Sequence, residues 1–474
     1  MSTHPQPFAL SQSAENASPS NDAGPRLRTF TLGCKVNQYE TEFVRQGLQR
    51  AGYRDAAADE PADLCVVNTC TVTQEGDAKS RQVIRRLGRD NPDARIVVMG
   101  CYATRAPAEV AALPQVSEVV TDKRELPDLL GRFGVIDVPT GIAGFAGRKR
   151  AYVKVQDGCL LRCSYCIIPL VRPQLTSRPL TDILAEVERL TSAGHREVVL
   201  TGIHLGHYGV DWNRDKPKTE WIRLADLVRQ LADLPGQFRI RLSSIEATEV
   251  TRELIDVLRE SSGRVVPHLH LCLQSGSDSV LRRMRRRWGT RMFLDRCQML
   301  REALDQPALT TDVIVGFPGE TDQEFEATLA TCRAAGFSKI HVFPFSPRRG
   351  TPAAEMPDQV PAEVRQERVQ RLLQLESELR QNYFQSLVGR RLQFLVDVVD
   401  RPEVAGPTAA EDIGAGKYRV SGISCRYAPV VATAARPPKT NALLDAVVTA
   451  NRGDELIAEL DPPPTGTLTP PARN

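Results

Sequence analysis

Three cysteines in one short loop constrain this chain more than any other feature of its sequence. Cys159, Cys163 and Cys166 follow a β-like run at 152–156, in the spacing C-x-x-x-C-x-x-C. Thiolates bind iron–sulfur clusters and soft metal ions, so we expect this loop to fold around a metal centre at the end of a strand. Three thiolates can hold three irons of a four-iron cluster and leave the fourth iron open to a substrate.

Zinc is one alternative occupant of this loop, and three reduced, partly buried thiols are another reading. Structural zinc usually takes four ligands, commonly from paired C-x-x-C motifs. No second pair lies near the loop in the sequence. The spacing therefore favours an iron–sulfur cluster.

The loop resembles the cluster-binding loop of the radical S-adenosylmethionine (SAM) enzymes, and Tyr165 immediately before Cys166 fits their pattern too. The resemblance implies that the open iron chelates the amino and carboxylate groups of SAM. An electron from the cluster would then cleave the sulfonium, giving methionine and a 5′-deoxyadenosyl radical. Cofactors carry chemistry of this kind, whereas the protein supplies orientation and excludes side reactions.

A second group of cysteines lies nearer the amino terminus, where strand-like and helical stretches alternate. The strand-like runs are 28–32, 63–68 and 95–99, and the helical stretches are 40–51 and 76–89. This alternation predicts βαβ units and a parallel sheet. Cys34, Cys70 and Cys101 each follow a strand-like run within two residues. Ligands bind at the carboxyl ends of such strands, so we expect the three thiols to converge on a second cluster.

A buried, inert role is the alternative for any free cysteine. It suits Cys65, which lies inside a strand-like run, and also Cys272, Cys297 and Cys332, which lie within strand or helix patterns. It suits the amino-terminal trio poorly, because those cysteines stand at the junction of strand and loop beside glycine or polar residues.

Three segments around that trio resemble the amino-terminal domain of the methylthiotransferases, radical enzymes that insert sulfur and a methyl group into C–H bonds. The segments are Gly-Cys-Lys-Val-Asn-Gln-Tyr-Glu at 33–40, Asn-Thr-Cys-Thr-Val-Thr at 68–73 and Gly-Cys-Tyr at 100–102. The first is similar to the subgroup that acts on threonylcarbamoyl-adenosine in tRNA. The resemblance implies that Cys34, Cys70 and Cys101 hold an auxiliary [4Fe-4S] cluster that supplies or relays the sulfur.

The central part of the chain has six strand-like runs separated by helical stretches, which predicts a partial (β/α)6, TIM-like barrel. The runs are 151–156, 197–202, 238–243, 268–273, 310–315 and 339–344. Active sites of such barrels lie on the loops after the strands. Family analogy places SAM against six strand-end residues, although Gly and Ser there are also ordinary turn residues. They are Gly202, Ser244, Glu246, Gln274, Ser275 and Gly316. No catalytic side chain beyond the clusters and the cofactor is expected.

An arginine-rich run beside one barrel loop bears on binding partners. It contains Arg282, Arg283, Arg285, Arg286, Arg287 and Arg291. Such a run is usually a solvated helix face, but its density beside a tryptophan also suits contacts with RNA phosphates and bases. Conditional on the family resemblance, we interpret it as an RNA-binding surface.

The expected fold class is α/β, with a different architecture in each part. Residues 1–26 are a disordered tail, 27–138 form the amino-terminal parallel-sheet domain with the auxiliary cluster, and 149–384 form the radical SAM core. Five short strand-like runs in 385–460 predict a small OB-like barrel, which by position and size resembles the RNA-binding TRAM domain. Residues 461–474 are a Pro-rich disordered end.

Apolar runs and cysteine usage bear on the cellular compartment in which the protein is expected. No run of about 18 apolar residues occurs, so no membrane span is expected. The eleven cysteines are scattered through 474 residues, unlike the dense disulfide framework of a small secreted domain. Reducing cytoplasm is the expected location.

Two positions depart from the family pattern, one inside the cysteine loop and one shortly after it. Leu160 stands where the family commonly has Asn, and Pro173 follows Arg172 where the family commonly has Gly. Neither change removes a cluster ligand. Proline fixes φ where glycine would be free, so the departure bears on the path of the loop and on the fit of the substrate.

The resemblance implies a tRNA methylthiotransferase with two [4Fe-4S] clusters and SAM, converting N6-threonylcarbamoyladenosine beside the anticodon to its 2-methylthio derivative. Its partners would be the tRNA anticodon loop, an electron donor such as flavodoxin or ferredoxin, and a sulfur source. Isopentenyl-adenosine in tRNA or an aspartate of a ribosomal protein is an alternative substrate, against which Lys35-Val36 and the arginine run argue. A zinc-stabilised RNA-binding protein without catalysis is the alternative of another class.

Overall fold

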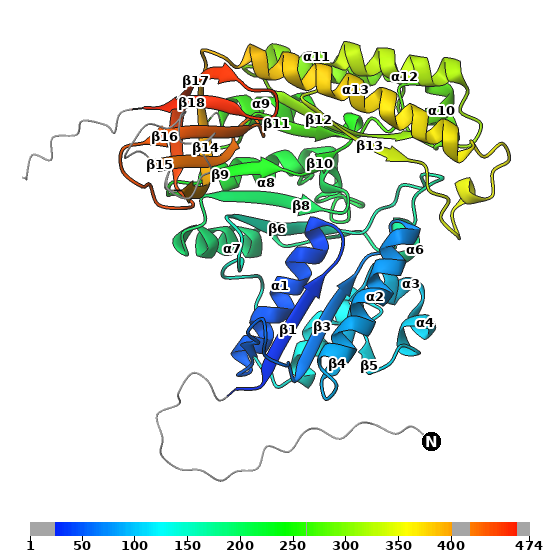
Figure 1. Cartoon of the computed structure of the whole chain (residues 1–474), viewed down its shortest axis with the longest axis vertical. Coiled ribbons are helices and arrows are strands. Elements are labelled where there is room, and N and C mark those ends of the chain that lie inside the picture. The colour runs from blue at the N-terminus through cyan, green and yellow to red at the C-terminus, as the bar shows by residue number, and fades with distance from the viewer. Residues whose placement is uncertain (1–23, 262, 401–417, 462–474) are drawn as a thin grey trace, which may run out of the picture.

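The structure is a computed structural model, and it describes residues 24–261, 263–400 and 418–461. The tails expected at 1–26 and 461–474 lie almost entirely outside these residues. Figure 1 shows an amino-terminal sheet with its helices, a central set of parallel strands, and a small carboxy-terminal barrel. In the part of the chain that the structure describes, no helix is both long and apolar enough to span a bilayer.

Five parallel strands form the amino-terminal sheet, in the order β2-β1-β3-β4-β5. Their bounds are β1 (Arg26–Thr31), β2 (Arg54–Asp55), β3 (Leu64–Thr69), β4 (Arg95–Gly100) and β5 (Val116–Val119). The helices are α1 (Lys35–Arg50), α2 (Gln74–Asp90), α3 (Cys101–Arg105), α4 (Pro107–Ala111) and α5 (Leu126–Arg132). Every residue of β3 is buried, as expected for a parallel strand that is covered on both faces.

Successive side chains of β3 enter two different cores, because side chains alternate between the faces of a strand. Leu64 and Val66 pack in one core with Val44 of α1. Cys65 and Val67 pack in the other with residues of α2. The sheet is therefore sandwiched between helices, and Cys65 is a core residue with no exposed surface.

Six parallel strands form the central unit, which confirms the predicted partial barrel. They are β6 (Arg150–Asp157), β8 (Glu197–Gly202), β9 (Arg239–Leu242), β11 (His268–Leu271), β12 (Ala308–Val315) and β13 (Lys339–Pro344). The edge strands β7 (Thr176–Ser177) and β10 (Ser244–Ile245) complete two four-stranded sheets. A bridge between Ile240 and Val265 joins β9 to the chain just before β11.

Helices lie on the outside of these strands, as Figure 1 shows. The longer ones are α7 (Leu180–Ser192), α8 (Leu224–Ala232), α9 (Arg252–Glu260), α11 (Thr290–Ala303), α12 (Asp322–Ala335) and α13 (Ala362–Ser386). Two short helices, α6 (Ile168–Val171) and α10 (Asp278–Arg283), follow the loops after β6 and β11.

The carboxy-terminal strands form a closed barrel in the order β14-β15-β16-β18-β17. They are β14 (Arg391–Asp400), β15 (Tyr418–Ser424), β16 (Pro429–Ala434), β17 (Leu443–Asn451) and β18 (Leu456–Leu460). The strands β16 and β18 run parallel, and the other neighbouring pairs are antiparallel. The small β-barrel expected at this end of the chain is confirmed.

Buried arginines join this tail barrel to the central strands. Arg239 donates to the backbone oxygens of Gln393 at 2.9 Å and Ile423 at 2.8 Å. Glu197 accepts from Arg239 Nε at 2.6 Å and from Arg241 Nε at 2.8 Å. Glu197 and Arg239 are the first residues of β8 and β9. The tail barrel therefore covers the amino-terminal ends of the central strands, opposite the cysteine loop.

The amino-terminal unit meets the central strands through helix α1, which packs against β6. Tyr39 Oη donates to Glu186 Oε1 of α7 at 3.0 Å. Lys154 Nζ of β6 donates to Glu40 Oε1 at 2.7 Å. This contact brings the carboxyl ends of the amino-terminal strands toward the cysteine loop.

Candidate functional site

The cysteine loop begins at a glycine that no other residue could replace without movement. Strand β6 ends at Asp157, and Gly158 turns the chain with φ of +75°. A Cβ atom there would lie 1.8 Å from the backbone oxygen of Gln174. Glycine adopts positive φ without steric cost, so the path of the whole loop depends on this residue.

The three thiols of this loop lie close enough for their charges to affect one another. Burial, with a smaller contribution from the charge of Cys163, raises the pKa of Cys159 to about 11 and that of Cys166 to about 12. None of the three forms a disulfide. A thiol must lose its proton to bind iron, so the raised pKa values of Cys159 and Cys166 favour their neutral form until a metal balances the charge. Three free thiols without a carboxylate among them fit a [4Fe-4S] cluster.

Two histidines border Cys159. His204 Nδ1 lies 3.5 Å from Cys159 Sγ, and its other ring nitrogen contacts Glu249. The ring of His207 stacks on that of His204 with centroids 3.6 Å apart. The ligand atoms of His204, His207 and Glu249 all lie within 4.8 Å of one another. From the sequence alone, His204 and His207 were interpreted as structural or substrate-edge residues rather than metal ligands. The contact between His204 and Glu249 joins two separate strand-end loops, so the sequence contains no local signal for it.

The second cysteine trio also converges. Cys34 caps α1, Cys70 follows β3, and Cys101 is the first residue of α3. Burial raises the pKa of Cys70, and the charges of Cys101 and Cys34 raise it further. Gly33 precedes the first cysteine with φ of +97°, and a Cβ there would lie 3.1 Å from Cys70 Sγ. The donor set is again three thiols without a disulfide, which fits a cluster.

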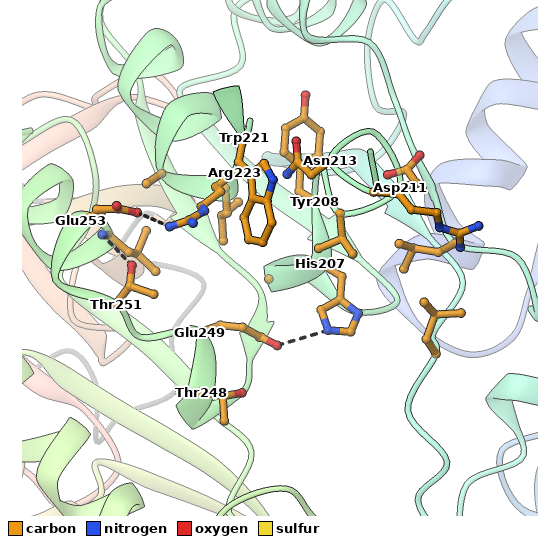
Figure 2. Close-up of a pocket in the computed structure, with 18 of the residues that line it drawn as sticks. His207, Tyr208, Asp211, Asn213, Trp221, Arg223, Thr248, Glu249, Thr251 and Glu253 are labelled. Atoms are coloured by element: carbon orange, nitrogen blue, oxygen red, sulfur yellow. Dashed lines mark hydrogen bonds and ion pairs between the residues drawn. The ribbon is translucent and has the colours of Figure 1, made fainter. Parts of the chain in front are cut away.

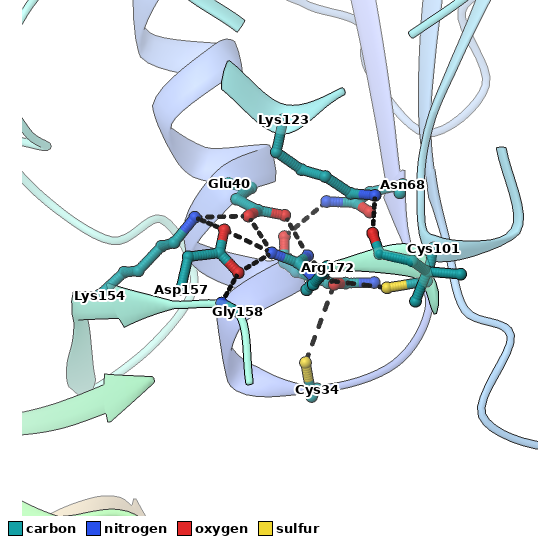
Figure 3. A network of polar contacts seen from close by, with 12 residues as sticks. Cys34, Glu40, Asn68, Cys101, Lys123, Lys154, Asp157, Gly158 and Arg172 are labelled. Carbon is teal, nitrogen blue, oxygen red and sulfur yellow. Dashed lines mark hydrogen bonds and ion pairs between the residues drawn. The ribbon is translucent and has the colours of Figure 1, made fainter. Parts of the chain in front are cut away.

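The two trios open onto one interface. Cys101 packs in a small apolar cluster with Ile167 and Val171, which follow Cys166. Arg172 Nε donates to Cys101 Sγ at 3.5 Å. Figure 3 shows this side chain among Cys34, Cys101 and Asp157. Residues from two units of the chain thus meet where both groups of thiols lie.

Four of the six strand-end candidates lie around the mouth of the barrel. Glu246 lines a small cavity with Cys163 and His204, and it accepts from Arg286 and from Trp288 Nε1. Of the other three, Gly202 ends β8, Ser244 begins β10 just after β9, and Gln274 follows β11 and bridges to Val313 of β12. Of these, Gln274 has φ of +65° and donates its backbone N–H to Asp312 at 2.8 Å.

The remaining two candidates are engaged with helices. Ser275 is buried, and its Oγ lies 3.3 Å from Thr328 Oγ1 of α12. Gly316 donates its backbone N–H to Glu320 at 2.6 Å, and a Cβ there would meet Arg365 of α13 at 2.3 Å. Both residues therefore shape the turns that lead from strand to helix.

The arginine run divides between interior and surface. Arg283 pairs with Glu324 at 2.8 Å, and Arg286 contacts Glu246, Cys163 Sγ and Tyr165 Oη. The other four side chains are exposed: Arg282, Arg285, Arg287 and Arg291. The run is thus partly a support of the cysteine loop and partly a cationic surface.

A cavity of about 900 Å³ opens beside the loop, and no local pattern in the sequence predicts it. Figure 2 shows Trp221, Arg223, His207 and Glu249 on its walls. Leu160, one of the two departures from the family pattern, also lines it. The cavity shares His207 and Glu249 with the small cavity at Cys163, so it adjoins the cysteine loop directly.

A second group of side chains of types that can bind metal lies within the barrel. His270, Cys272 and Asp312 present ligand atoms within 4.8 Å of one another. His270 Nδ1 lies 3.0 Å from Thr310 Oγ1, and the ring of His341 lies 5.7 Å from that of His270. Cys272 was expected to be a core residue, but it is only half-buried and stands in this polar group.

Comparison with known proteins agrees with this geometry. Residues 26–122 match the family model described as "Uncharacterized protein family UPF0004", and residues 153–332 match the model of the Radical SAM superfamily. The threonylcarbamoyladenosine tRNA methylthiotransferase MtaB of Bacillus subtilis (strain 168) is 44% identical over 74% of this chain and 80% of its own length. The protein of the same name from Chlamydia pneumoniae is 41% identical over 79% and 87%.

Other relatives are named for an adenosine with a different N6 substituent. The tRNA-2-methylthio-N(6)-dimethylallyladenosine synthase 2 of Mycobacterium marinum is 36% identical over 82% of this chain and 77% of its own length. Among solved structures, the radical S-adenosylmethionine methyltransferase TsrM of Kitasatospora setae superposes with a TM-score of 0.51 at 14% identity. That match covers 70% of this chain and 77% of TsrM, and it supports the fold alone.

Proposed function

Because the chain belongs to the radical SAM methylthiotransferases that act on tRNA, we propose that it converts N6-threonylcarbamoyladenosine beside the anticodon to its 2-methylthio derivative, using two [4Fe-4S] clusters. The observation that carries the proposal is the placement of two cysteine trios at one interface. Methylthiolation needs a radical and a sulfur donor next to one carbon atom. Two adjoining sites meet that need.

Cys159, Cys163 and Cys166 would hold the cluster that binds SAM, and Cys34, Cys70 and Cys101 would hold the auxiliary cluster. The first cluster, when bound and reduced, would supply the electron that cleaves SAM into methionine and a 5′-deoxyadenosyl radical, and the auxiliary cluster would supply or relay sulfur. The protein's own residues position these groups. Arg286 and Trp288 fix the Glu246 carboxylate at the mouth of the barrel, where it can accept hydrogen bonds from SAM.

Relatives and local charge both favour the threonylcarbamoyl substrate. The relatives with that name reach 44% identity, against 36% for the dimethylallyladenosine synthase of Mycobacterium marinum. Lys35 is exposed at the start of α1, beside Cys34. Burial lowers the pKa of His341 inside the barrel, and the charge of Lys35 contributes to that shift. A cation at this position suits the carboxylate of the threonyl group, whereas an isopentenyl group would need an apolar surface.

RNA would approach from the mouth of the barrel. Arg285 and Arg287 line the small cavity at Cys163 and are exposed, so they are placed to contact tRNA phosphates. An unpaired anticodon loop offers splayed bases, the usual target of specific RNA recognition. The tail barrel would add an RNA-binding surface of the TRAM kind, and an electron donor such as flavodoxin or ferredoxin and a separate sulfur source complete the partners.

The substrate assignment is tested with defined tRNAs. The reconstituted protein is incubated with SAM and reductant, together with tRNA that carries either threonylcarbamoyl-adenosine or isopentenyl-adenosine, and the nucleosides are analysed by mass spectrometry. We expect the 2-methylthio derivative only in the first tRNA. Methylthiolation of the isopentenyl-adenosine tRNA alone would overturn the substrate and leave the radical chemistry in place.

A further inference from the structure

We propose that Arg172 is a positioning residue that ties the SAM cysteine loop to the auxiliary cysteines and sets the reduction potential of the cluster they hold. The proposal rests on the proposed function, because it needs iron at Cys34, Cys70 and Cys101. It concerns a residue that the sequence distinguished only by the proline that follows it. Figure 3 shows the contacts that carry it.

Arg172 is buried between the two units and uses its whole guanidinium group. Its side chain is 1% exposed. Nη1 and Nη2 donate to the two carboxylate oxygens of Glu40, both at 2.8 Å. Nη1 also donates to both oxygens of Asp157 at 2.8 Å. Bidentate pairing of this kind fixes the orientation of an arginine as well as its position.

The same side chain reaches two auxiliary cysteines. Nε donates to Cys101 Sγ at 3.5 Å. Nη2 donates to Asn37 Oδ1 at 3.0 Å, and that oxygen lies 3.8 Å from Cys34 Sγ. Arg172 is therefore in direct contact with one auxiliary ligand and one residue away from another.

The backbone of Arg172 belongs to the other site. Its carbonyl oxygen accepts from the backbone N–H of Cys159 at 3.4 Å. Its partner Asp157 also accepts from the backbone N–H of Gly158 at 2.7 Å, where the cysteine loop begins. A shift of the SAM loop would move Arg172, and a shift of Arg172 would alter the contact with Cys101.

Charge explains why this contact matters for redox chemistry. The ion pairs around Arg172 join two cations (Arg172 and Lys154) to two anions (Glu40 and Asp157), and the charge of Lys123 also acts on Cys101 and on this group. Ligand thiolates add negative charge to this buried region, and reduction adds more. A permanent cation with an N–H bond to a ligand sulfur stabilises the reduced state, because charge and hydrogen bonds to sulfur set cluster potentials. Loss of Arg172 should make the auxiliary potential more negative.

A merely structural role would have a different signature. Arg178 is the matched control, since it pairs with Glu186 at 2.6 Å and donates to the backbone oxygen of Lys154 at 2.6 Å in the same inter-unit contact. Its described hydrogen bonds go to no cysteine. Removing Arg178 would weaken the contact between the units without removing a hydrogen bond to a ligand sulfur.

The experiment isolates the auxiliary site. In the full chain with Cys159→Ala, Cys163→Ala and Cys166→Ala, the reconstituted protein should hold about four irons, and its midpoint potential is measured by EPR-monitored titration. Adding Arg172→Gln should shift the potential to more negative values, and adding Arg172→Lys should shift it less, because the charge remains. Adding Arg178→Gln should leave the potential unchanged.

Each other outcome has a distinct meaning. Iron bound with an unchanged potential in Arg172→Gln, or an equal shift in Arg178→Gln, would overturn the tuning role. Loss of iron from both Arg172 variants, with iron retained in Arg178→Gln, would also overturn it, since Arg172 would then be needed to form the site. Absence of iron from the parent variant would instead contradict the auxiliary cluster in the proposed function.

Discussion

The six cysteines of the two trios belong to different units, so their contributions can be separated residue by residue. Replacing Cys34, Cys70 and Cys101 with Ala should reduce the iron content from about eight to about four per chain. Reductive cleavage of SAM should persist, because the other trio lies on a separate loop after β6. Iron assay and chromatography of 5′-deoxyadenosine measure the two effects. Loss of cleavage with the remaining cluster intact would contradict separate roles.

Glu197 is the residue on which the joint between barrel and tail depends. It has no exposed side-chain surface and lies between Arg239 and Arg241. Glu197→Gln would leave two buried guanidinium groups without their anion, which costs about 3–5 kcal/mol. Urea unfolding of the metal-free protein should show this loss. Glu188→Gln on the exposed face of α7 is the control and should change stability by less than about 0.5 kcal/mol.

The same carboxylate makes stability depend on pH. Burial alone would raise the pKa of Glu197, but Arg241 and Arg239 lower it well below its usual range. Its contribution is therefore fully present above the unfolded pKa of about 4.3 and is lost as pH falls toward the folded pKa. The difference in unfolding free energy between wild type and Glu197→Gln should shrink as pH falls below about 4. A constant difference would contradict the assigned charge state.

At the scale of elements, the cysteine loop depends on one turn. Gly158→Ala combines positive φ with a Cβ placed 1.8 Å from the oxygen of Gln174, so the loop must move. We expect loss of about four of about eight irons and loss of SAM cleavage, while the auxiliary site keeps its cluster. Gly144→Ala, where a Cβ would meet nothing within 4 Å, is the control. Full iron content in Gly158→Ala would show that the loop tolerates a different path.

The exposed arginines of the run should affect how strongly tRNA binding depends on salt concentration. Arg285 and Arg287 are exposed at the mouth of the barrel, so changing both to Gln should reduce the slope of log affinity for tRNA against log salt by about 1.4, at about 0.7 per phosphate contact. Arg85→Gln with Arg89→Gln on the exposed face of α2 removes the same charge elsewhere. Equal slopes in the two double variants would place the RNA away from the barrel mouth.

Helices and strands could be predicted from the sequence where a local pattern of residues marks them. Periodicity and composition predicted the buried strands β3, β4, β8 and β12 within two residues of their observed ends. The sequence did not predict β2, β7 or β10, which have two residues each, because such short pairings have no period. The strand-end position of each cysteine was visible for the same local reason. Helix α1 begins at Lys35, five residues earlier than expected, directly after Cys34.

Contacts between residues far apart in the chain could not be predicted from local sequence patterns. The pairing of Arg172 with Glu40 joins positions 132 residues apart. The cavity of about 900 Å³ beside the cysteine loop and the contact between His204 and Glu249 likewise form only where several loops meet. The sequence could not distinguish the buried Arg286 from its exposed neighbours, because all of them are arginines in the same short stretch. Such assignments need the three-dimensional fold.

At the scale of the whole molecule, the tail barrel is both a cover and an expected RNA-binding surface. His268 stacks on Tyr427 of the tail with centroids 4.7 Å apart, and Arg239 depends on tail carbonyl groups. Removing residues 385–474 should therefore lower the melting temperature of the remainder and also weaken tRNA binding with a smaller salt slope. Calorimetry and filter binding measure the two effects. Unchanged affinity would contradict the RNA-binding role, and an unchanged melting temperature would contradict the structural one.

The link between Arg172 and Cys101 has a consequence for the order of events during synthesis. Their positions are 71 residues apart, so the ribosome completes the auxiliary trio before it makes the side chain that packs against it. At roughly 5–20 residues per second, this interval lasts about 4–14 seconds. During that time the nascent amino-terminal sheet presents its thiols without the later loop against them. If this trio holds the proposed auxiliary cluster, iron would have its most open path to these thiols in this interval, before the second unit arrives.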